Sequence, residues 1–383
     1  METIYLDNSA TSYPKPDQVI EAICHFMQNI GANPGRGGHT SSLSASRLIL
    51  ETRELIGDFF GGRSPEEVIL TQNITHALNI VIKGYLNKND HVITTKYEHN
   101  SVLRPLNSLK SEKNISYDFL PVSPEGDFDL NTLDKLKKEN TRLIIISHAS
   151  NVSGVILNIK KAVDWAKYND IPIMIDTAQT AGTYKFNWQE LNADFIGFTG
   201  HKGFMGPAGT GGLIISQEMV EKTRPFIEGG TGSKSDLLTQ PDLLPDKYEA
   251  GTQNSPGIAG LNAALKFIRQ TGIENIDSKI KENYRLLHQG LSELKGINII
   301  GPQNLKNKVS TISLTFTDHD PAEIGFTIDK NYGIMARTGL HCAPLAHKTL
   351  GTYPEGTLRL SPGYFTTKNE IEKTIQAFKE TIT

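Results

Sequence analysis

Six short apolar runs, separated by helical patterns, constrain the fold of this 383-residue chain more than any other feature. Several of them lack the polar alternation of a half-exposed strand, so they predict buried strands of a mainly parallel sheet. Helical patterns over 75–86 and 158–169 fall between the runs. Alternating strands and helices predict an α/β fold, with helices on both faces of an open sheet. The runs are EVIL (67–70), HVITT (91–95), RLIIIS (142–147), IPIMID (171–176), ADFIGF (193–198) and TGGLIIS (210–216).

The pattern changes after about residue 255. The elements expected there are two helices over 255–272 and 273–296, two strands over 297–300 and 309–316, and a last helix from Lys368. They indicate a smaller α+β domain. We therefore predict a large domain over residues 15–255 and a small C-terminal domain over 256–383, with residues 1–14 packing against the small one.

Charge and cysteine content narrow the class of protein. The formal net charge of -3 gives no bulk electrostatic reason to expect binding to nucleic acid or to an anionic membrane. Cys24 and Cys342 are too few for a disulfide framework and fit a reducing cytoplasm. No apolar run approaches the ~20 residues of a membrane span, and the N-terminal METIYLDNSAT lacks the apolar core of a secretion signal. We expect a cytoplasmic enzyme or a large soluble binding protein.

The candidate site residues follow the apolar runs, because ligands of an open α/β sheet bind beyond the carboxyl ends of its strands. After the first run, Thr75 stands where a helix should begin, and the free N–H groups of a helix N-terminus bind anions. The alternative is that Thr75 only caps this helix. The spacing GxxxxGK[ST] of a P-loop is absent.

The second and third runs also end in polar residues. His99 follows the second run, beside Glu98 and Asn100. It either stacks on a flat heterocycle or titrates in catalysis, or it is a solvated or capping histidine. Asn151 follows the third run and is the polar residue best placed there to reach into a crevice. No cluster of histidine, cysteine and carboxylate has the spacing of metal ligands, so we expect no zinc site.

The fourth and fifth runs lead to a carboxylate and an amine. Asp176 ends an apolar strand, where a carboxylate is costly unless something pairs with it. Either Asp176 caps the next helix, or it pairs with the protonated ring nitrogen of pyridoxal phosphate, with Gln179 placed to bond the ring hydroxyl. Lys202 precedes glycines that let backbone approach closely. A lysine in a dry crevice loses its proton readily and can form a Schiff base, whereas a lone lysine is usually a solvated charge.

Taken together and in this order, the polar residues after the apolar runs favour the catalytic interpretation of each residue over the simpler one. Their motifs also resemble a known family. The motifs that carry the resemblance span nearly the whole chain: YLDNSAT, NPGRGGH, EHNS, SNVSG, DTAQ, TGHKG, YEAGTQN, RTGLHCA and RLSPGYFTT. They resemble the class V aminotransferase family of fold-type I pyridoxal 5'-phosphate (PLP) enzymes. Within it, the cysteine desulfurases of group II and the selenocysteine lyases are the most similar.

The resemblance implies a role for each matching residue. At the cofactor, the implied residues are Lys202 as the Schiff-base lysine, Asp176 at the pyridine nitrogen, Gln179 at the ring hydroxyl and His99 stacked on the ring. The implied phosphate ligands are Thr75, Thr199 and His201, backbone groups of Ile74 and His76, and Thr252 from a neighbouring subunit. Thr252 therefore implies a homodimer with shared sites. For the substrate amino acid, the implied ligands are Asn151, Arg359, Arg337 and His39, with Arg359 holding the carboxylate as a bidentate fork.

RTGLHCA (337–343) resembles the loop that carries the catalytic cysteine of group II desulfurases. In those enzymes a thiolate attacks the sulfur of bound cysteine and leaves a persulfide and alanine. Arg337 and His341 would make the loop electropositive and favour the thiolate of Cys342. Cys24 lies in VIEAICHFM and is expected to pack inside a helix interface.

Three positions depart from the family pattern. Leu340 precedes His341 where the family often has a second histidine. In the phosphate loop, Ile74 replaces a common hydroxyl residue and His76 a common acidic residue. These departures leave cofactor binding intact and bear on the substrate and the sulfur acceptor.

Three functions compete. The first is a PLP-dependent cysteine desulfurase that takes L-cysteine and passes sulfur to an acceptor protein, with selenocysteine lyase as its close sibling. The second is a class V aminotransferase or another lyase, in which Cys342 has no role. The third is a non-catalytic binding protein with the same fold, and the set of Lys202, Asp176 and Arg359 counts against it.

Overall fold

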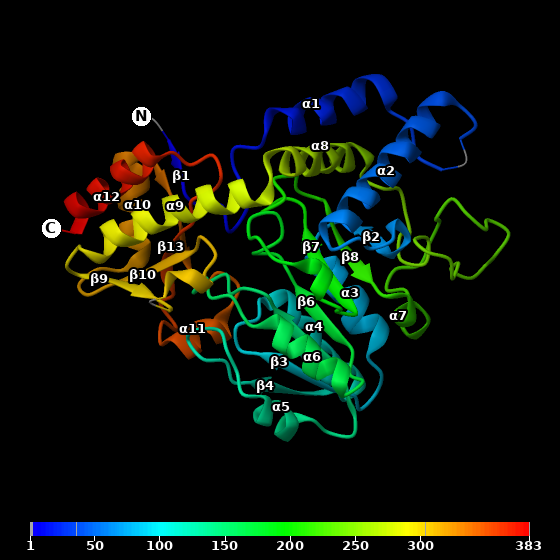
Figure 1. The fold of residues 1–383 in the computed structure, drawn as a ribbon, viewed down its shortest axis with the longest axis horizontal. Helices are drawn as coiled ribbons and strands as arrows, with labels where there is room; N and C mark the ends of the chain where they lie inside the picture. Colours follow the sequence, from blue (N-terminus) through cyan, green and yellow to red (C-terminus); the bar gives the residue numbers. More distant parts are fainter. Residues whose placement is uncertain (1–2, 36, 303, 383) are drawn as a thin grey trace.

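The large sheet has seven strands in the order β2-β8-β7-β6-β5-β3-β4 (Figure 1), in a computed structural model that describes residues 3–35, 37–302 and 304–382. Strands β3 to β7 pair in parallel, whereas β8 lies antiparallel between β7 and β2. The connection from β7 to β8 contains no helix that could return the chain for a parallel pairing. The strands are β2 (Val68–Thr71), β3 (His91–Thr95), β4 (Ser116–Leu120), β5 (Thr141–Ser147), β6 (Ile173–Asp176), β7 (Phe195–Thr199) and β8 (Gly211–Ile215).

Both faces of this sheet are buried, which explains why the apolar runs do not alternate with polar residues. In β5, Ile144 and Ile146 pack into one hydrophobic cluster, and Leu143 and Ile145 pack into another. Successive side chains of a strand point to opposite faces, so the two clusters lie on the two sides of the sheet. The predicted mainly parallel sheet with helices on both faces is confirmed.

Two sets of helices, one on each face of the sheet, supply further residues of these two clusters. The helices that contribute most to the first cluster are α2 (Thr40–Phe59), α5 (Leu130–Leu136), α6 (Ile159–Tyr168) and α8 (Ser255–Thr271), and two residues of the helix over 273–292 join them. The helices of the second cluster are α3 (Ile74–Tyr85), α4 (Asn100–Lys113) and α7 (Gln217–Lys222). Helix α1 (Asp17–His25) packs on the outside of α8 (Figure 1). None of the helices in the described residues is long and apolar enough to cross a membrane.

A small antiparallel sheet, β12-β13-β10-β9, forms the second part of the fold together with α9, α10 and α12 (Figure 1). Ile4 and Leu6 of the N-terminal segment belong to its hydrophobic cluster. The predicted smaller α+β unit is confirmed, and the boundary at residue 255 stays a prediction. The elements are β1 (Ile4–Tyr5), α9 (Ile273–Ser292), β9 (Ile297–Ile300), β10 (Ile312–Phe316), α10 (Pro321–Tyr332), β11 (Ile334–Met335), β12 (Arg337–Gly339), α11 (Pro344–Leu350), β13 (Thr357–Leu360) and α12 (Lys368–Ile382), with β1 paired to β11.

The expectation that Cys24 is packed is wrong. Its side chain is exposed on α1, in a row with Ile20 and Met27, which are 57% and 65% exposed. The opposite side of the helix holds Val19, which is buried. The sequence did not show which side of α1 is buried, because apolar residues lie on both sides of the helix. Both groups of apolar residues have the spacing of three and four residues that is typical of a buried helix face.

Candidate active site

A cavity of about 280 Å³ lies at the carboxyl ends of β3, β5, β6 and β7. Ligand pockets range from roughly 300 to 1,000 Å³, so the cavity suits a small cofactor or substrate. Its position agrees with the general location of ligands in open α/β sheets. The predicted site residues that line it are Ile74, Thr75, His99, Asn151, Asp176, Gln179, Thr199, His201 and Lys202.

Lys202 lies in the turn after β7 and is partly buried. Burial lowers its pKa to about 8, while the nearby charge of Asp176 acts in the opposite direction. The turn fits here because Gly203 has no side chain, since a Cβ on it would overlap the carbonyl oxygen of Ala181. The amine is therefore easier to deprotonate than a surface lysine.

Asp176 ends β6 and is 5% exposed. Burial raises its pKa, and the backbone N–H of Ala178, 2.9 Å from Oδ1, opposes this together with the charge of Lys202. One oxygen thus caps the following turn, as the simpler alternative expected, while the side chain also lines the cavity. A cationic ring nitrogen would offset the remaining cost of this buried carboxylate. Gln179 lines the same cavity and donates its Nε2 to the carbonyl of Ser9 at 3.1 Å.

His99 is both a cap and a lining residue. It is the N-cap of α4, and its Nδ1 accepts the backbone N–H of Ser101 at 3.1 Å. Burial and then the charge of Lys202 lower its pKa to about 4. The ring is consequently neutral near pH 7, with its proton on Nε2 because Nδ1 is an acceptor.

One end of the cavity suits an anion. Thr199 Oγ1 is buried and has no hydrogen-bond partner among the residues that the structure describes. Thr75 lies in the first turn of α3, whose N-cap is Asn73, so the interpretation of Thr75 as the cap is wrong. His201 closes this end, with its pKa lowered to about 4 by burial and by Lys202. A helix N-terminus beside an unused hydroxyl donor fits the phosphate of PLP.

Six of the predicted residues do not line this cavity: His39, His76, Thr252, Arg337, Cys342 and Arg359. The backbone N–H of His76 already donates to the side chain of Asn73 at 3.0 Å. Thr252 is exposed and lines another hollow with His76 and Gly251. His39 is exposed at the start of α2, where its Nδ1 accepts the N–H of Ser42 at 3.3 Å.

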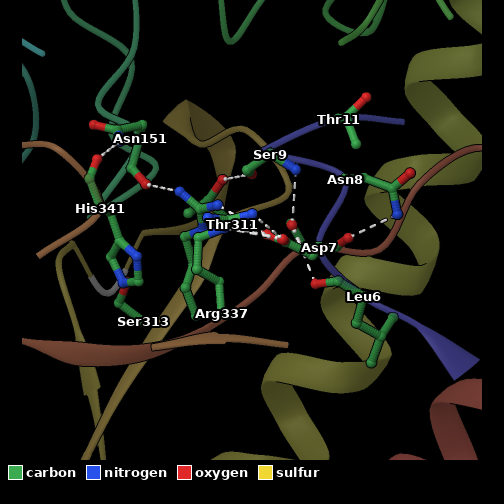
Figure 2. A network of polar contacts seen from close by, with 12 residues as sticks. Leu6, Asp7, Asn8, Ser9, Thr11, Asn151, Thr311, Ser313, Arg337 and His341 are labelled. Carbon is green, nitrogen blue, oxygen red and sulfur yellow. Dashed lines mark hydrogen bonds and ion pairs between the residues drawn. The ribbon is translucent and has the colours of Figure 1, made fainter. Parts of the chain in front are cut away.

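The residues predicted to bind the substrate, Asn151, Arg337 and Arg359, lie close to Asp7, and we call this group the substrate end (Figure 2). Arg337 and Arg359 face each other across β12 and β13. Arg359 is 2% exposed, and its NH1 donates to the carbonyl of Asn151 at 3.1 Å. Its NH2 lies 3.0 Å from Oδ1 of Asp7, which also pairs with Arg337. Asp7 lies in the motif YLDNSAT, but the sequence analysis predicted no role for it. A buried carboxylate needs a partner, and this requirement could have drawn attention to it.

The loop after β12 holds Cys342 in an uncommon backbone conformation. His341 and Cys342 have φ values of 47° and 58°, in the left-handed region that non-glycine residues rarely adopt. Two bonds fix the loop: Asn151 Nδ2 donates to the carbonyl of His341 at 2.7 Å, and Asn100 N–H to that of Cys342 at 2.8 Å. The side chain of Cys342 is exposed. Through the second bond, its backbone contacts the first residue of the helix that His99 caps.

The electropositive character of this loop comes from arginine alone. Burial lowers the pKa of His341 to about 2, so this ring is neutral near pH 7. The expectation that His341 adds positive charge is therefore wrong. Arg337 is half-exposed, and its pKa is raised mainly by Asp7 and also by Cys342.

Sequence reasoning also left Glu98 without a role. It is fully buried, and its pKa is raised to about 7, mainly by burial. Its place just after an apolar run was visible in EHNS, but only the neighbouring His99 was interpreted as a site residue.

Comparisons with known proteins agree with this geometry. The family model described as "Aminotransferase class-V" matches residues 4–374. A probable cysteine desulfurase of Pyrococcus abyssi is 34% identical over 390 residues, which cover 100% of this chain and 94% of the relative. The apo structure of a cysteine desulfurase from Thermococcus onnurineus has a TM-score of 0.93 and 33% identity, covering 99% of this chain and 94% of that chain.

A second solved structure is that of the cysteine desulfurase CsdA of Escherichia coli. Its TM-score is 0.88 and its identity 26%, and the match covers 100% of this chain and 96% of that chain. The match of the family model over almost the whole length, together with relatives above 30% identity, shows that the chain belongs to the class V aminotransferase family.

Proposed function

We propose that this protein is a PLP-dependent cysteine desulfurase, which converts L-cysteine to L-alanine and takes the sulfur as a persulfide on Cys342. The observation that carries the proposal is the position of Cys342. It is exposed on a loop whose backbone contacts the His99 helix at one edge of the Lys202 cavity. The names of the relatives support the same activity.

PLP fits the cavity. The buried hydroxyl of Thr199 and the N-terminus of α3 suit its phosphate, and the buried Asp176 suits its ring nitrogen. When bound, PLP supplies an electron sink for the carbon skeleton of the substrate. Lys202 would hold the cofactor covalently, and its lowered pKa favours the amine form that this bond requires.

The residues of this chain would then bind the substrate and move protons and sulfur. Arg359 would bind the substrate carboxylate, while Nε2 of His99 would donate a hydrogen bond into the cavity. The thiolate of Cys342 would form an S–S bond with the substrate sulfur as the Cβ–S bond of the substrate breaks. The electron pair of the broken bond stays on the three-carbon fragment, which takes up a proton at Cβ and leaves as alanine.

The subunit arrangement is part of the proposal. Thr252 is exposed and lines a second hollow, of about 580 Å³, with Gly230 and Arg53. Exposed apolar side chains lie on α1, on α2 and in the segment before Thr252: Ile20, Met27, Leu43, Leu50, Leu237, Leu238 and Leu243. Apolar surface of this kind favours a protein contact, and we propose a cytoplasmic homodimer in which Thr252 completes the phosphate site of the partner. An acceptor protein would collect the sulfur from exposed Cys342.

Two variants test the proposed chemistry. Lys202→Ala should lose the visible absorbance of the bound cofactor and all alanine formation, because it removes the amine that binds the cofactor. Cys342→Ala should keep the absorbance and lose sulfur release from L-cysteine by at least about two orders of magnitude, the scale on which removal of a nucleophile acts. Alanine and sulfide are measured together, with Cys24→Ala as the matched cysteine control.

Other outcomes favour the remaining functions. Full sulfide release by Cys342→Ala would contradict the persulfide step. Efficient conversion of a keto acid to an amino acid by the unaltered enzyme would identify an aminotransferase instead. Selenide release from selenocysteine without sulfide release from cysteine would identify a selenocysteine lyase.

A further inference from the structure

Asp7 pairs with both arginines of the substrate end, and Figure 2 shows it beside Arg337. It follows β1 in the N-terminal segment and pairs with Ser361 beyond the end of β13. Its side chain is 12% exposed, so the carboxylate is largely removed from water. A carboxylate in this position needs cationic or hydrogen-bonding partners.

Both arginines bind this carboxylate. Arg337 donates Nε to Oδ2 at 2.9 Å and to Oδ1 at 3.2 Å, and its NH2 lies 2.8 Å from Oδ2. Arg359 donates NH2 to Oδ1 at 3.0 Å. One negative charge therefore lies between two positive charges, and the group as a whole keeps a net charge of about one positive unit.

The remaining donors belong mainly to Arg359. Its Nε is buried and has no hydrogen-bond partner in the described part of the chain. Its NH1 bonds only the neutral carbonyl of Asn151, at 3.1 Å. Arg359 therefore keeps donors for one further anionic group. In Arg337, by contrast, Nε and NH2 are already bound to Asp7.

Asp7 is not required to hold the N-terminal segment in place, because backbone bonds do so. Leu6 N–H donates to the carbonyl of Met335 at 2.9 Å, and Ser361 N–H donates to that of Leu6 at 2.6 Å. Asn8 N–H bonds the carbonyl of Ser361 at 3.2 Å, and Ser9 N–H bonds its Oγ at 2.9 Å. The carboxylate is therefore free to have an electrostatic role.

We propose that Asp7 determines substrate specificity, because it reduces two arginine charges to one and so matches the site to amino acids with a single carboxylate. This inference rests on one part of the proposed function, the binding of the substrate carboxylate by Arg359, and not on the transfer of sulfur. The substrate class that follows is amino acids with an uncharged side chain. Amino acids with an acidic side chain would need the second cationic charge that Asp7 neutralises.

Asp7→Asn tests the inference by removing one charge at nearly constant shape. The holoenzyme is titrated with L-alanine and with L-aspartate, and binding is followed by the change in its visible absorbance. The affinity for aspartate relative to alanine should rise at least about tenfold, because a unit charge a few ångströms away acts with this strength even at a high effective dielectric constant. Asp127→Asn, which removes an exposed carboxylate paired with Lys161, is the control and should leave the ratio unchanged.

A second variant keeps the test independent of the folding of Asp7→Asn. Arg337→Gln alters a half-exposed side chain and leaves Asp7 to neutralise Arg359. It should weaken alanine binding about tenfold, and the Asp7→Asn/Arg337→Gln double variant should recover the alanine affinity and the low aspartate affinity. An unchanged aspartate-to-alanine ratio in Asp7→Asn, or unchanged alanine affinity in Arg337→Gln, would overturn the proposal. The titrations need no sulfur release, so absence of desulfurase activity would refute the proposed function and leave this inference standing.

Discussion

Glu98 is a fully buried carboxyl group that joins the ends of β3 and β5. Thr95 Oγ donates to its Oε1 at 2.7 Å, and Ser147 Oγ donates to its Oε2 at 2.6 Å. The backbone N–H of Ser147 adds bonds of 3.0 and 3.1 Å. Burial is the largest influence and raises the pKa of Glu98 to about 7, with a smaller contribution from the charge of Asp176. The group therefore ties β3, which precedes His99, to β5, which pairs with the strand of Asp176, and its protonated form is favoured on folding.

Glu98→Gln should flatten the dependence of stability on pH. Because the folded pKa is raised, the stabilising contribution of Glu98 is present below its unfolded pKa of about 4.5 and is lost as pH rises to about 7. Between pH 5 and pH 8 the unaltered protein should lose about 2 to 3 kcal/mol of unfolding free energy that the variant does not lose. Denaturant unfolding at both values measures this, with the exposed Glu125→Gln as control. Parallel curves for Glu98→Gln and the unaltered protein would contradict it.

At the level of single residues, the sequence predicts where a side chain lies in the fold better than it predicts the protonation state and the partners of that side chain. Asp176, His99 and Lys202 follow strands, and the ends of parallel strands meet at one edge of the sheet. Their common cavity was therefore predictable. The neutral state of His341 and the pairing of Asp7 depend on burial and on residues hundreds of positions away, which no local pattern encodes.

Two turns at the site pack directly on each other. The turn after β6 contains Gly182, whose φ is 86°, and the turn after β7 contains Gly203 beside Lys202. A Cβ on Gly182 would overlap backbone atoms of Gly203 and would lie 2.6 Å from the backbone N of Phe204. Backbone cannot move aside as a flexible side chain does.

Gly182→Ala should therefore displace the turn that carries Lys202. We expect cofactor affinity to fall at least about tenfold and unfolding free energy to fall by about 3 kcal/mol, since overpacking adds to the cost of a positive φ. Gly62→Ala is the matched control, because its φ is 80° and a Cβ there meets nothing within 4 Å. The control should cost only about 1 to 2 kcal/mol and leave cofactor binding unchanged. Equal effects of the two variants would contradict the proposed contact.

At the level of elements, doubly buried strands were the most predictable. The run 91–95 coincides with β3, and the other runs differ from their strands by one or two residues. Strand β4 was missed because it is an edge strand of intermediate burial, with tyrosine and aspartate in its middle. The two- and three-residue strands β11 and β12 are too short to show any periodicity.

At the level of the whole molecule, the seven-stranded and four-stranded sheets are joined by the N-terminal segment as well as by α9. Ile4 and Leu6 lie in the small core, while Ser12 N–H donates to the carbonyl of His201, next to Lys202, at 3.0 Å. Class and general architecture were predictable from alternating strand and helix patterns. The packing of residues 1–14 with the small domain was predicted together with the domain division, and β1, with two residues, is too short to show a periodicity of its own.

The proposed homodimer with shared sites predicts that activity returns in certain mixed dimers. Lys202→Ala and Thr252→Glu should each be inactive as pure proteins, the second because its carboxylate repels the phosphate of the cofactor. Mixed dimers, produced by coexpression with two different tags, should regain about half of the normal activity per dimer, because one of two sites then has both native residues. Activity of the doubly purified dimers is measured directly.

The matched control for the mixed dimers combines Lys202→Ala with Asp176→Ala. Both residues line the same cavity of one chain, so neither site of the mixed dimer is intact. Recovery in the first pair and none in the second is the expected pattern. No recovery in either pair would place Thr252 in its own subunit's site, and activity of pure Thr252→Glu would exclude Thr252 from both sites.

The contacts of Asp7 also set the order in which the site can form during synthesis. Asp7 precedes Arg337 by 330 residues and Arg359 by 352. At roughly 5 to 20 residues per second, it waits between about 15 and 70 seconds for its partners to be made. By then the ribosome has released the whole large sheet, with Lys202 and Asp176. The cavity that suits the cofactor can thus assemble while the two arginines proposed to select the substrate are still being translated.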